Sequence, residues 1–299
     1  MKTIKFISIC ICLCFITCNS DSEQEIEQEI EQEQEIDCSD FDYDQYTRFV
    51  YGELYSERLA FMGMDRPSDS YNYPLYPKMD EYIVLESGAR WAANQVPECI
   101  LRKMSTQAVI QAIWEKPELY QFFIALDPFF QSNIETFIKN YSAFGELAKR
   151  EDAGVALLER LTVVDPLTGL FGYESQMLEL LLSRTDFLSQ LNESEKRKIV
   201  EISLDHDETR FAAWWADLDD SIAQYTRPIT WILVGKTMFS VGYAPFIEAV
   251  NENEALKCYI EGWMRPDPNG AIQKYAYIPP IYGYTPQIIS EHAKNYINN

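Results

Sequence analysis

The chain has 299 residues, 47% of them hydrophobic, and is therefore long enough to bury the core of one large domain or two small ones. Its 47 acidic residues outnumber its 25 basic residues and give a formal net charge of −22. This charge excludes the basic footprint of a nucleic-acid-binding protein and attachment to anionic lipid through a basic face.

The N-terminus has the features of an export signal. Two lysines precede the apolar stretch Phe6–Thr17, which is too short for a hydrocarbon core because that needs about 20 residues. Residues Phe15–Cys18 resemble the lipobox of bacterial lipoproteins. The resemblance implies that a signal peptide, 1–17, is removed and that Cys18 carries acyl chains, palmitate among them, through which the membrane is a partner. A short uncleaved anchor is the alternative.

The residues after Cys18 bear on whether the protein stays in the inner membrane or reaches the outer membrane. Ser20 stands at the position where Asp is associated with retention in the inner membrane, and the acidic segment Asn19–Glu23 looks like the export tags of surface-exposed lipoproteins. The resemblance therefore implies an outer-membrane lipoprotein that is exposed on the cell surface.

Residues 18–38 are predicted to form a lipidated acidic tether. Glu stands at every second position of Glu23–Ile36, and like charges at this spacing oppose a helix. As a coil, about 14 residues span on the order of 20 Å, which would hold the folded part clear of the lipid. Outside the signal and lipid site the chain has Cys38, Cys99 and Cys258, so at most one disulfide can form among them, and the sequence leaves the pairing open.

A helical domain is expected over 39–299, with a subdivision near 207–227 as an alternative. A first helix is predicted from Ser39 to Met64. The following segment, 65–77, contains three prolines and is predicted to be a loop over the core, because proline interrupts regular elements. The tyrosines of this loop are expected to stay partly exposed.

From Asp80 to His206 the apolar residues recur at helical spacing, and prolines separate the segments. Four prolines stand where a first helical turn favours them, namely Pro97, Pro117, Pro128 and Pro166. Ser105 is predicted to cap a helix, and Asn192–Glu195 has the spacing of a capping box. Phe137 lies in the centre of an apolar stripe and is expected in the core. Helices of about 8–16 residues with short connections must pack antiparallel on their neighbours, so the fold class is all-α, a layered helical array that forms a bundle or a short irregular superhelix.

Part of this region also resembles a group of uncharacterised exported bacterial lipoproteins. The shared feature is a Pro-Glu-x-x-Leu-x-x-Met-Ser-Thr stretch, present here in Pro97–Val109 and followed by FIKNYSAFGELAKREDAG at Phe137–Gly154. The resemblance implies a helical fold and export from the cytoplasm. It implies no activity.

The C-terminal third is predicted to contain a buried helix over Pro228–Val241, with Trp231 in the core. Gly242 is expected to end this helix, Pro245 to begin another, and Glu254–Trp263 to form a third. An aromatic and proline-rich extension, 274–286, is predicted to be extended. A short helix from Gln287 to Tyr296 closes the chain.

Seven aromatic side chains are candidate ligand-binding residues. Tyrosines beside prolines could line a groove for a peptide or glycan, and two adjacent tryptophans could form a platform for a sugar. Core packing and tyrosines that cover helix ends explain the same residues equally well. The candidates are Tyr71, Tyr73, Tyr76, Trp214, Trp215, Tyr282 and Tyr284.

No metal, cofactor or nucleophile site is expected. His206 lies between Asp205 and Asp207, but consecutive helical positions do not converge on one ion, so a solvated helix end is predicted there. Asp267–Gly270 is predicted to be a turn, since its glycine is misplaced for a calcium loop.

The resulting hypothesis is a lipid-anchored surface protein that acts as a binding or scaffold module for a glycan, peptide or protein, without a cofactor; the sequence leaves catalysis open. One alternative is a hydrolase that uses carboxylates such as Asp217 and Asp219 on glycans. Another is an accessory subunit of a surface assembly.

Overall fold

The structure is a computed structural model. It describes residues 64–75, 79–117, 140–167, 173–217, 220–261, 264–266, 272–274 and 279–299. The predicted signal peptide, tether and first helix lie outside these residues except for Met64, and so do Phe137, Pro128 and the turn predicted at 267–270. The chain divides into two compact units, Met1–Phe41 and Asp42–Asn299, and every described residue belongs to the second.

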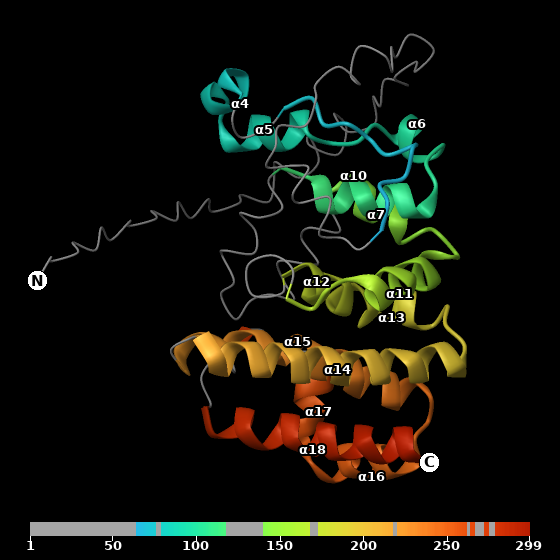
Figure 1. The fold of residues 1–299 in the computed structure, drawn as a ribbon, viewed down its shortest axis with the longest axis vertical. Helices are drawn as coiled ribbons and strands as arrows, with labels where there is room; N and C mark the ends of the chain where they lie inside the picture. Colours follow the sequence, from blue (N-terminus) through green and yellow to red (C-terminus); the bar gives the residue numbers. More distant parts are fainter. Residues whose placement is uncertain are drawn as a thin grey trace, which may run out of the picture. The chain divides into compact units, whose positions relative to one another are not determined.

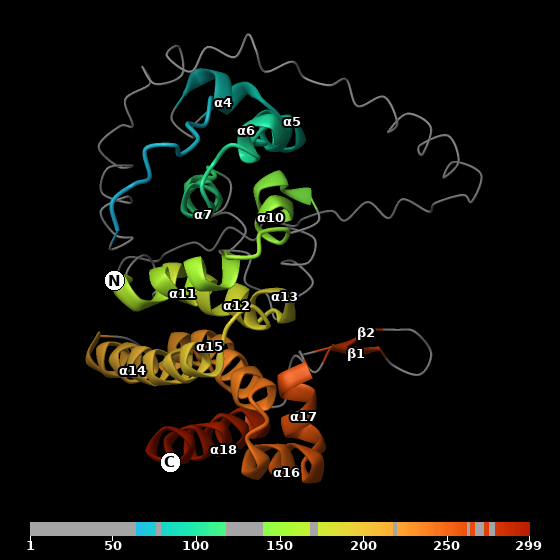
Figure 2. The same ribbon diagram turned by 90° about the vertical axis from the view of Figure 1, so that its right-hand side faces the viewer.

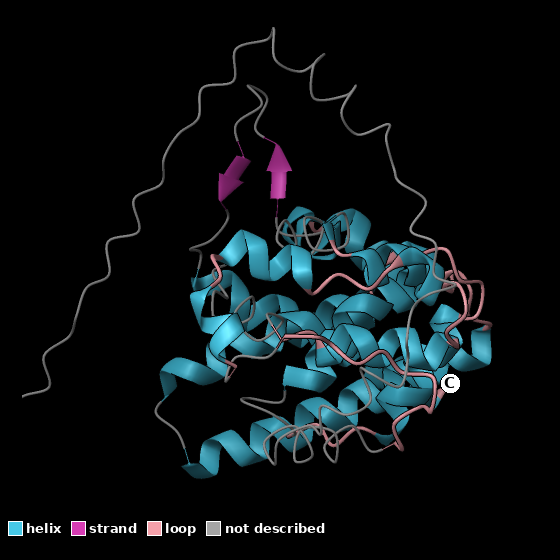
Figure 3. Cartoon of the chain, turned by 90° about the horizontal axis from the view of Figure 1, so that it is seen from above, coloured by secondary structure: helices cyan, strands magenta, loops and turns pink. Residues whose placement is uncertain are grey.

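The described part of the second unit is built almost entirely from α-helices, as Figure 3 shows. Its helices are α4 (Asp80–Val84), α5 (Ser87–Ala93), α6 (Glu98–Leu101), α7 (Thr106–Glu115), α10 (Ser142–Leu147), α11 (Ala153–Val163), α12 (Tyr173–Leu182), α13 (Thr185–Leu188), α14 (Glu193–Asp217), α15 (Asp220–Ser240), α16 (Ala244–Glu252), α17 (Glu254–Glu261) and α18 (Pro279–Asn298). Two three-residue strands, β1 (Met264–Pro266) and β2 (Ile272–Lys274), pair antiparallel.

The helices pack in successive layers (Figure 1). In the first layers α10 packs on α6 and α7, and α7 packs on α11. Helix α11 then contacts α12, α13 and α14, while α12 contacts α15. Helices α14 and α15 lie side by side, and both contact α18. Helices α16 and α17 complete the last layer against α15 and α18 (Figure 2). The prediction of an all-α layered array is confirmed.

Several helix ends follow from local sequence signals. The Ser105 hydroxyl accepts a hydrogen bond from the Ala108 amide (3.2 Å) and caps α7. At the start of α14, Asn192 Oδ1 accepts from the Glu195 amide (3.0 Å) and Glu195 Oε2 accepts from the Asn192 amide (2.8 Å). These two bonds are the predicted capping box.

Glycine ends α15 as predicted. Gly242 has a φ of 75°, in the left-handed region that a side chain disfavours. The Tyr243 amide donates to the Met238 carbonyl and the Gly242 amide to the Phe239 carbonyl, both at 3.1 Å. This pattern is a Schellman motif, and it satisfies carbonyls that the helix leaves without partners. Helix α16 then begins at Ala244 with Pro245 in its first turn.

Two predicted boundaries in the C-terminal third are wrong. Helix α15 begins at Asp220, so Pro228 lies inside the helix and not at its start. Helix α18 begins at Pro279, so residues 279–286 are helical and not extended. In both cases a proline, Pro228 or Pro286, predicts a boundary, whereas packing against neighbouring helices stabilises a helix that continues past it.

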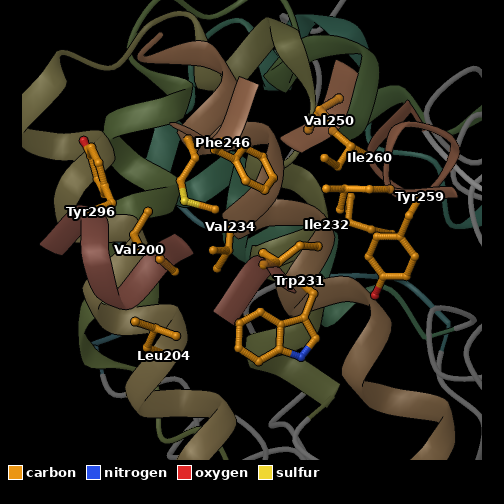
Figure 4. Close-up of a cluster of buried hydrophobic side chains, with 14 residues drawn as sticks. Val200, Leu204, Trp231, Ile232, Val234, Phe246, Val250, Tyr259, Ile260 and Tyr296 are labelled. Atoms are coloured by element: carbon orange, nitrogen blue, oxygen red, sulfur yellow. The ribbon is translucent and has the colours of Figure 1, made fainter. Parts of the chain in front are cut away.

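The core of the last layers is one apolar cluster between α14, α15, α16, α17 and α18 (Figure 4). Trp231 is 5% exposed, and it lies close to Ile232 and Tyr259 in this cluster. The prediction that Trp231 is a core residue is confirmed. Within the described part of the chain, no helix is both long and apolar enough to cross a bilayer.

Replacing Trp231 by Ala should lower the free energy of unfolding by about 3–5 kcal/mol, because it removes a large buried ring and leaves a cavity. The matched control is Phe239→Ala on the same helix, where the ring is 48% exposed and the loss should be below about 1 kcal/mol. Urea unfolding followed by circular dichroism measures both. Equal losses for the two variants would contradict the cluster as described.

Candidate functional site

Glu179 of α12 is the centre of a buried ionic cluster. Its Oε1 accepts a hydrogen bond from Arg210 Nη2 of α14, and its Oε2 accepts one from the Thr230 hydroxyl of α15, both at 2.7 Å. The same Arg210 nitrogen donates to Thr230 Oγ1 (2.8 Å), and Nη1 donates to Ser175 Oγ (2.7 Å). All four residues are buried. The cluster therefore joins three helices through charge-assisted hydrogen bonds.

His206 lies one turn before Arg210 on α14 and belongs to the same cluster. Its Nδ1 is 3.6 Å from Glu179 Oε1 and makes no hydrogen bond. The side chain is buried, so the prediction of a solvated helix end at His206 is wrong. The reason is that α14 continues to Asp217 and packs against α11, α15 and α18. Among the described residues no three His, Cys, Asp or Glu side chains converge as metal ligands.

The electrostatics of the cluster fix the charge of Glu179. Burial by itself raises the pKa of this carboxyl, but the Arg210 guanidinium, with His206 and Thr230, outweighs burial and holds the pKa below its ordinary 4.5. Glu179 is therefore an ionised partner of Arg210 at neutral pH. Because its oxygens are already occupied by Arg210 and Thr230 and it is fully buried, the arrangement suits helix cross-linking.

A second polar chain runs along one face of α7. Both oxygens of Glu115 accept from Arg66, at 2.7 Å from Nε and 3.0 Å from Nη2, and Oε1 also accepts from Gln111 Nε2 (2.8 Å). Gln111 Oε1 in turn accepts from Arg160 Nη1 of α11 (2.7 Å). Burial lowers the pKa of Arg160 to about 10, against the opposing effect of Glu115, so the guanidinium stays protonated at neutral pH.

Lys116 follows α7 and is completely buried. Its Nζ donates to the Asn94 carbonyl (2.9 Å) and lies over three aromatic rings, 4.3 Å from the centroid of Trp91, 4.6 Å from that of Tyr141 and 5.9 Å from that of Tyr73. A cation over the face of an aromatic ring is attracted by the ring quadrupole. The lysine thus ties α5, the end of α7 and the start of α10 together.

The end of α7 explains why tyrosines are needed there. Lys116 precedes Pro117 and has a ψ of 121°, as expected before proline, so α7 stops at Glu115. The Ala112 carbonyl is therefore one of the acceptors that a helix end leaves over. It accepts from the Tyr73 hydroxyl (2.7 Å), and the single hydrogen of the Tyr141 hydroxyl is donated either to the same carbonyl (3.2 Å) or to the Tyr73 oxygen.

The prediction that the tyrosines of the 65–77 loop stay partly exposed is wrong for the two that the structure describes. Tyr71 is 5% exposed and Tyr73 is 2% exposed, and their rings pack edge to face. Both side chains are buried, Tyr73 against α7 and Tyr71 against Tyr73, so neither lines an open groove. Tyr76 lies outside the described residues.

The remaining candidates are placed only by their backbone. Trp214 and Trp215 are consecutive residues near the end of α14. Tyr282 and Tyr284 are in the first half of α18. The side chains of all four, and that of Asp217 at the end of α14, lie outside the described residues, as does Asp219 entirely.

Neither ionic cluster is predicted from the sequence. A signal was present, because Glu179 interrupts the apolar run MLELLL and Arg160 interrupts LLERLTVV. A charge inside such a run is rarely buried without a partner. The partner itself cannot be read from one sequence, since Arg210 lies 31 residues from Glu179.

Cys99, at the beginning of α6, forms a disulfide bond. The sequence allowed one disulfide and left its occurrence open. Searches of protein-family models, curated proteins and solved structures find no match to this chain. The fold and sites define an all-α protein with internal ionic clusters, and its function has to be argued from its own residues.

Replacing Tyr73 by Phe should lower the free energy of unfolding by about 1–2 kcal/mol, because the Ala112 carbonyl loses its shorter hydrogen bond in a buried place. Tyr243→Phe is the control, since this half-buried tyrosine makes no hydrogen bond through its hydroxyl to the described residues. Thermal melts and urea titrations measure the difference. No change in Tyr73→Phe would contradict the capping role.

Replacing Arg210 by Met should lower the free energy of unfolding by about 3–5 kcal/mol at neutral pH, because Glu179 is left as a buried, unpaired charge. In the wild type, the lowered pKa of Glu179 stabilises the fold above 4.5, and this contribution is lost as the pH falls through the folded-state pKa. In the variant burial dominates and raises the pKa of Glu179, so the carboxyl can bind a proton. The difference in the free energy of unfolding between the wild type and Arg210→Met should therefore shrink as the pH falls below 4.5.

The double variant Glu179→Leu/Arg210→Met is the control for this experiment. It removes both charges and should lose less stability than Arg210→Met alone. Urea midpoints at neutral and acidic pH measure all three proteins. A stability difference between the wild type and Arg210→Met that grows at acidic pH would contradict the assignment of Glu179 as an ionised carboxylate.

Proposed function

We propose that this protein is an exported lipoprotein, anchored through acyl chains on Cys18, whose layered helices act at the cell surface as a binding or scaffold module. The disulfide bond of Cys99 is the observation that supports export from the cytosol. Disulfides persist in oxidising compartments and are rare in the cytosol. This supports the address that the lipobox-like stretch Phe15–Cys18 implies.

Acylation of Cys18 is the physical basis of the anchor. A single acyl chain binds a membrane only marginally, whereas two or more hold a protein stably. The chain's net charge of −22 disfavours an electrostatic attachment to anionic lipid. The proposed attachment therefore depends on the lipid chains of Cys18, and the proposed place is the outer leaflet of the outer membrane.

The binding or scaffold role is supported by the buried charged side chains of the described residues, which bond to neighbouring helices and segments. Glu179, Glu115 and Lys116 each contact side chains or carbonyls of neighbouring segments. Their chemistry is used to hold the helices of the array together. A rigid helical array of this kind offers its outer faces to a partner, which we propose to be a peptide or protein.

Replacing Cys18 by Ala should abolish metabolic labelling with palmitate and move the protein out of the membrane fraction, because the acylated sulfur is lost. Cys14→Ala is the matched control, since it removes a neighbouring cysteine that the proposal does not acylate. Labelling and fractionation of both variants test the anchor. Palmitate that persists in Cys18→Ala would overturn it.

The binding role is tested on arrays of peptides and glycans with the detergent-solubilised protein. Retention of a ligand without its conversion supports a binding module. Cleavage of arrayed glycans would overturn it in favour of a hydrolase. Both outcomes are independent of the labelling result.

A further inference from the structure

The turn that joins α15 to α16 is an exposed and uncharged segment, which we call the corner. It comprises residues 239–245, with the sequence FSVGYAP, and each of these residues is at least partly exposed. The uncharged stretch extends beyond the turn, from Thr237 to Ile247, although 24% of the residues of the chain are charged. We propose that the corner contacts the interface of a lipid bilayer. This contact rests on the membrane attachment proposed above and identifies the part of the helical array that touches the membrane.

The corner is held in one shape by the residues that flank it. Met238 before it and Phe246 after it are completely buried, and both belong to the apolar cluster of the last layers. The Tyr243 amide donates to the Met238 carbonyl (3.1 Å) and closes the turn, while Gly242 supplies the left-handed residue that the turn requires. Because the turn is already ordered, little conformational entropy is lost when it meets a partner.

Two aromatic side chains give the corner the chemistry of a membrane interface. The Phe239 ring is 48% exposed. The Tyr243 ring is half-buried and packs edge to face against Tyr296 (5.2 Å between ring centroids) and against His292 (6.4 Å). The hydroxyl of Tyr243 makes no hydrogen bond to the described residues. A ring with an apolar body and a polar tip suits the level of the lipid headgroups, where one end of the side chain is in an apolar medium and the other is in water.

The distribution of charge distinguishes Phe239 from the other exposed apolar side chains. The large apolar residues that are exposed in the described part of the chain are Ile83, Val84, Val163, Leu167, Phe211 and Phe239. Each of the others has an acidic residue within three positions, whereas the acidic residue nearest to Phe239 in the sequence is Glu248, nine positions away. A carboxylate is costly to bring into a bilayer and is repelled by anionic headgroups. A chain with a net charge of −22 is therefore expected to meet lipid where it has no acidic side chain.

The size of the corner favours lipid over a protein as its partner. A stable protein–protein interface takes about 20–30 residues from each side. The corner has seven residues, 239–245, which is enough for a few aromatic and apolar side chains to enter the headgroup region. A contact of this size adds to an attachment that another group provides, here the acyl chains proposed on Cys18. Once the chain is attached, the corner meets lipid at a high effective concentration.

Fluorine NMR measures the contact at a single side chain. 4-Fluorophenylalanine takes the place of Phe239 in one preparation of the full chain and of Phe211 in another. Both preparations carry Cys18→Ala, so that acylation plays no part, and both are mixed with phosphatidylcholine vesicles that contain a nitroxide-labelled lipid. The nitroxide should broaden the resonance at position 239 about five-fold more than the resonance at position 211. The ring of Phe211 is also exposed, by 36%, but Glu208 lies three positions before it.

Ala244→Glu places a carboxylate in the corner without disturbing the fold. Ala244 is exposed and is the first residue of α16, where a negative charge is favoured by the helix dipole. In this variant the broadening at position 239 should fall to the level seen at position 211. Ala212→Glu, at an exposed position of α14, is the matched control and should leave the broadening at position 239 unchanged. Circular dichroism verifies that both variants are folded.

Equal broadening at positions 239 and 211, or broadening at position 239 that survives Ala244→Glu, would overturn the membrane contact. Stronger broadening when anionic phosphatidylglycerol replaces part of the phosphatidylcholine would overturn it as well, because the lipid would then be held by a basic surface. Palmitate labelling of Cys18 is a separate measurement on a chain that keeps this cysteine. Failure of the proposed anchor and failure of the corner contact are therefore distinguishable.

Discussion

The ion pair between Glu179 and Arg210 is buried where α12, α14 and α15 meet, and the register of these helices depends on it. A charge removed from water costs several kcal/mol unless a partner and further hydrogen bonds replace the lost hydration. Thr230 and Ser175 supply those bonds. A shift of any of the three helices by one turn would separate the groups, so the pair selects one arrangement among many that would bury the same apolar area.

The same requirement acts at the other end of the array. Lys116 ends α7 before Pro117, and the Ala112 carbonyl that the helix leaves over is buried with it. Tyr73 donates a hydrogen bond to this carbonyl, and Tyr141 donates either to it or to Tyr73. The Lys116 ammonium donates to the Asn94 carbonyl and lies over the Trp91 ring. Because Pro117 ends α7, the free Ala112 carbonyl joins two tyrosines, Tyr73 and Tyr141, that are far apart in the sequence.

These internal networks bear on the proposed function. The proposed surface protein would have to keep its fold outside the cell, and the disulfide bond of Cys99 would contribute to its stability there. Residues 64–75 are attached differently, since side chains rather than backbone pairing hold them to α7.

The sequence alone determined the helical class of the fold, the caps at Ser105 and Asn192 and the turn at Gly242, because each depends on bonds between residues at most five apart. It also predicted the core position of Trp231, since an apolar run on a helix has to face inward. Proline misled at Pro228 and Pro286, which lie inside α15 and α18, where packing extends the helices beyond the local signal. Only the tertiary structure decided that Tyr73 and His206 are buried and that Glu179 pairs with Arg210. The physical reason is that burying a polar side chain costs free energy unless it gains a partner, and the partners of Tyr73 and Glu179 come from other helices tens of residues away.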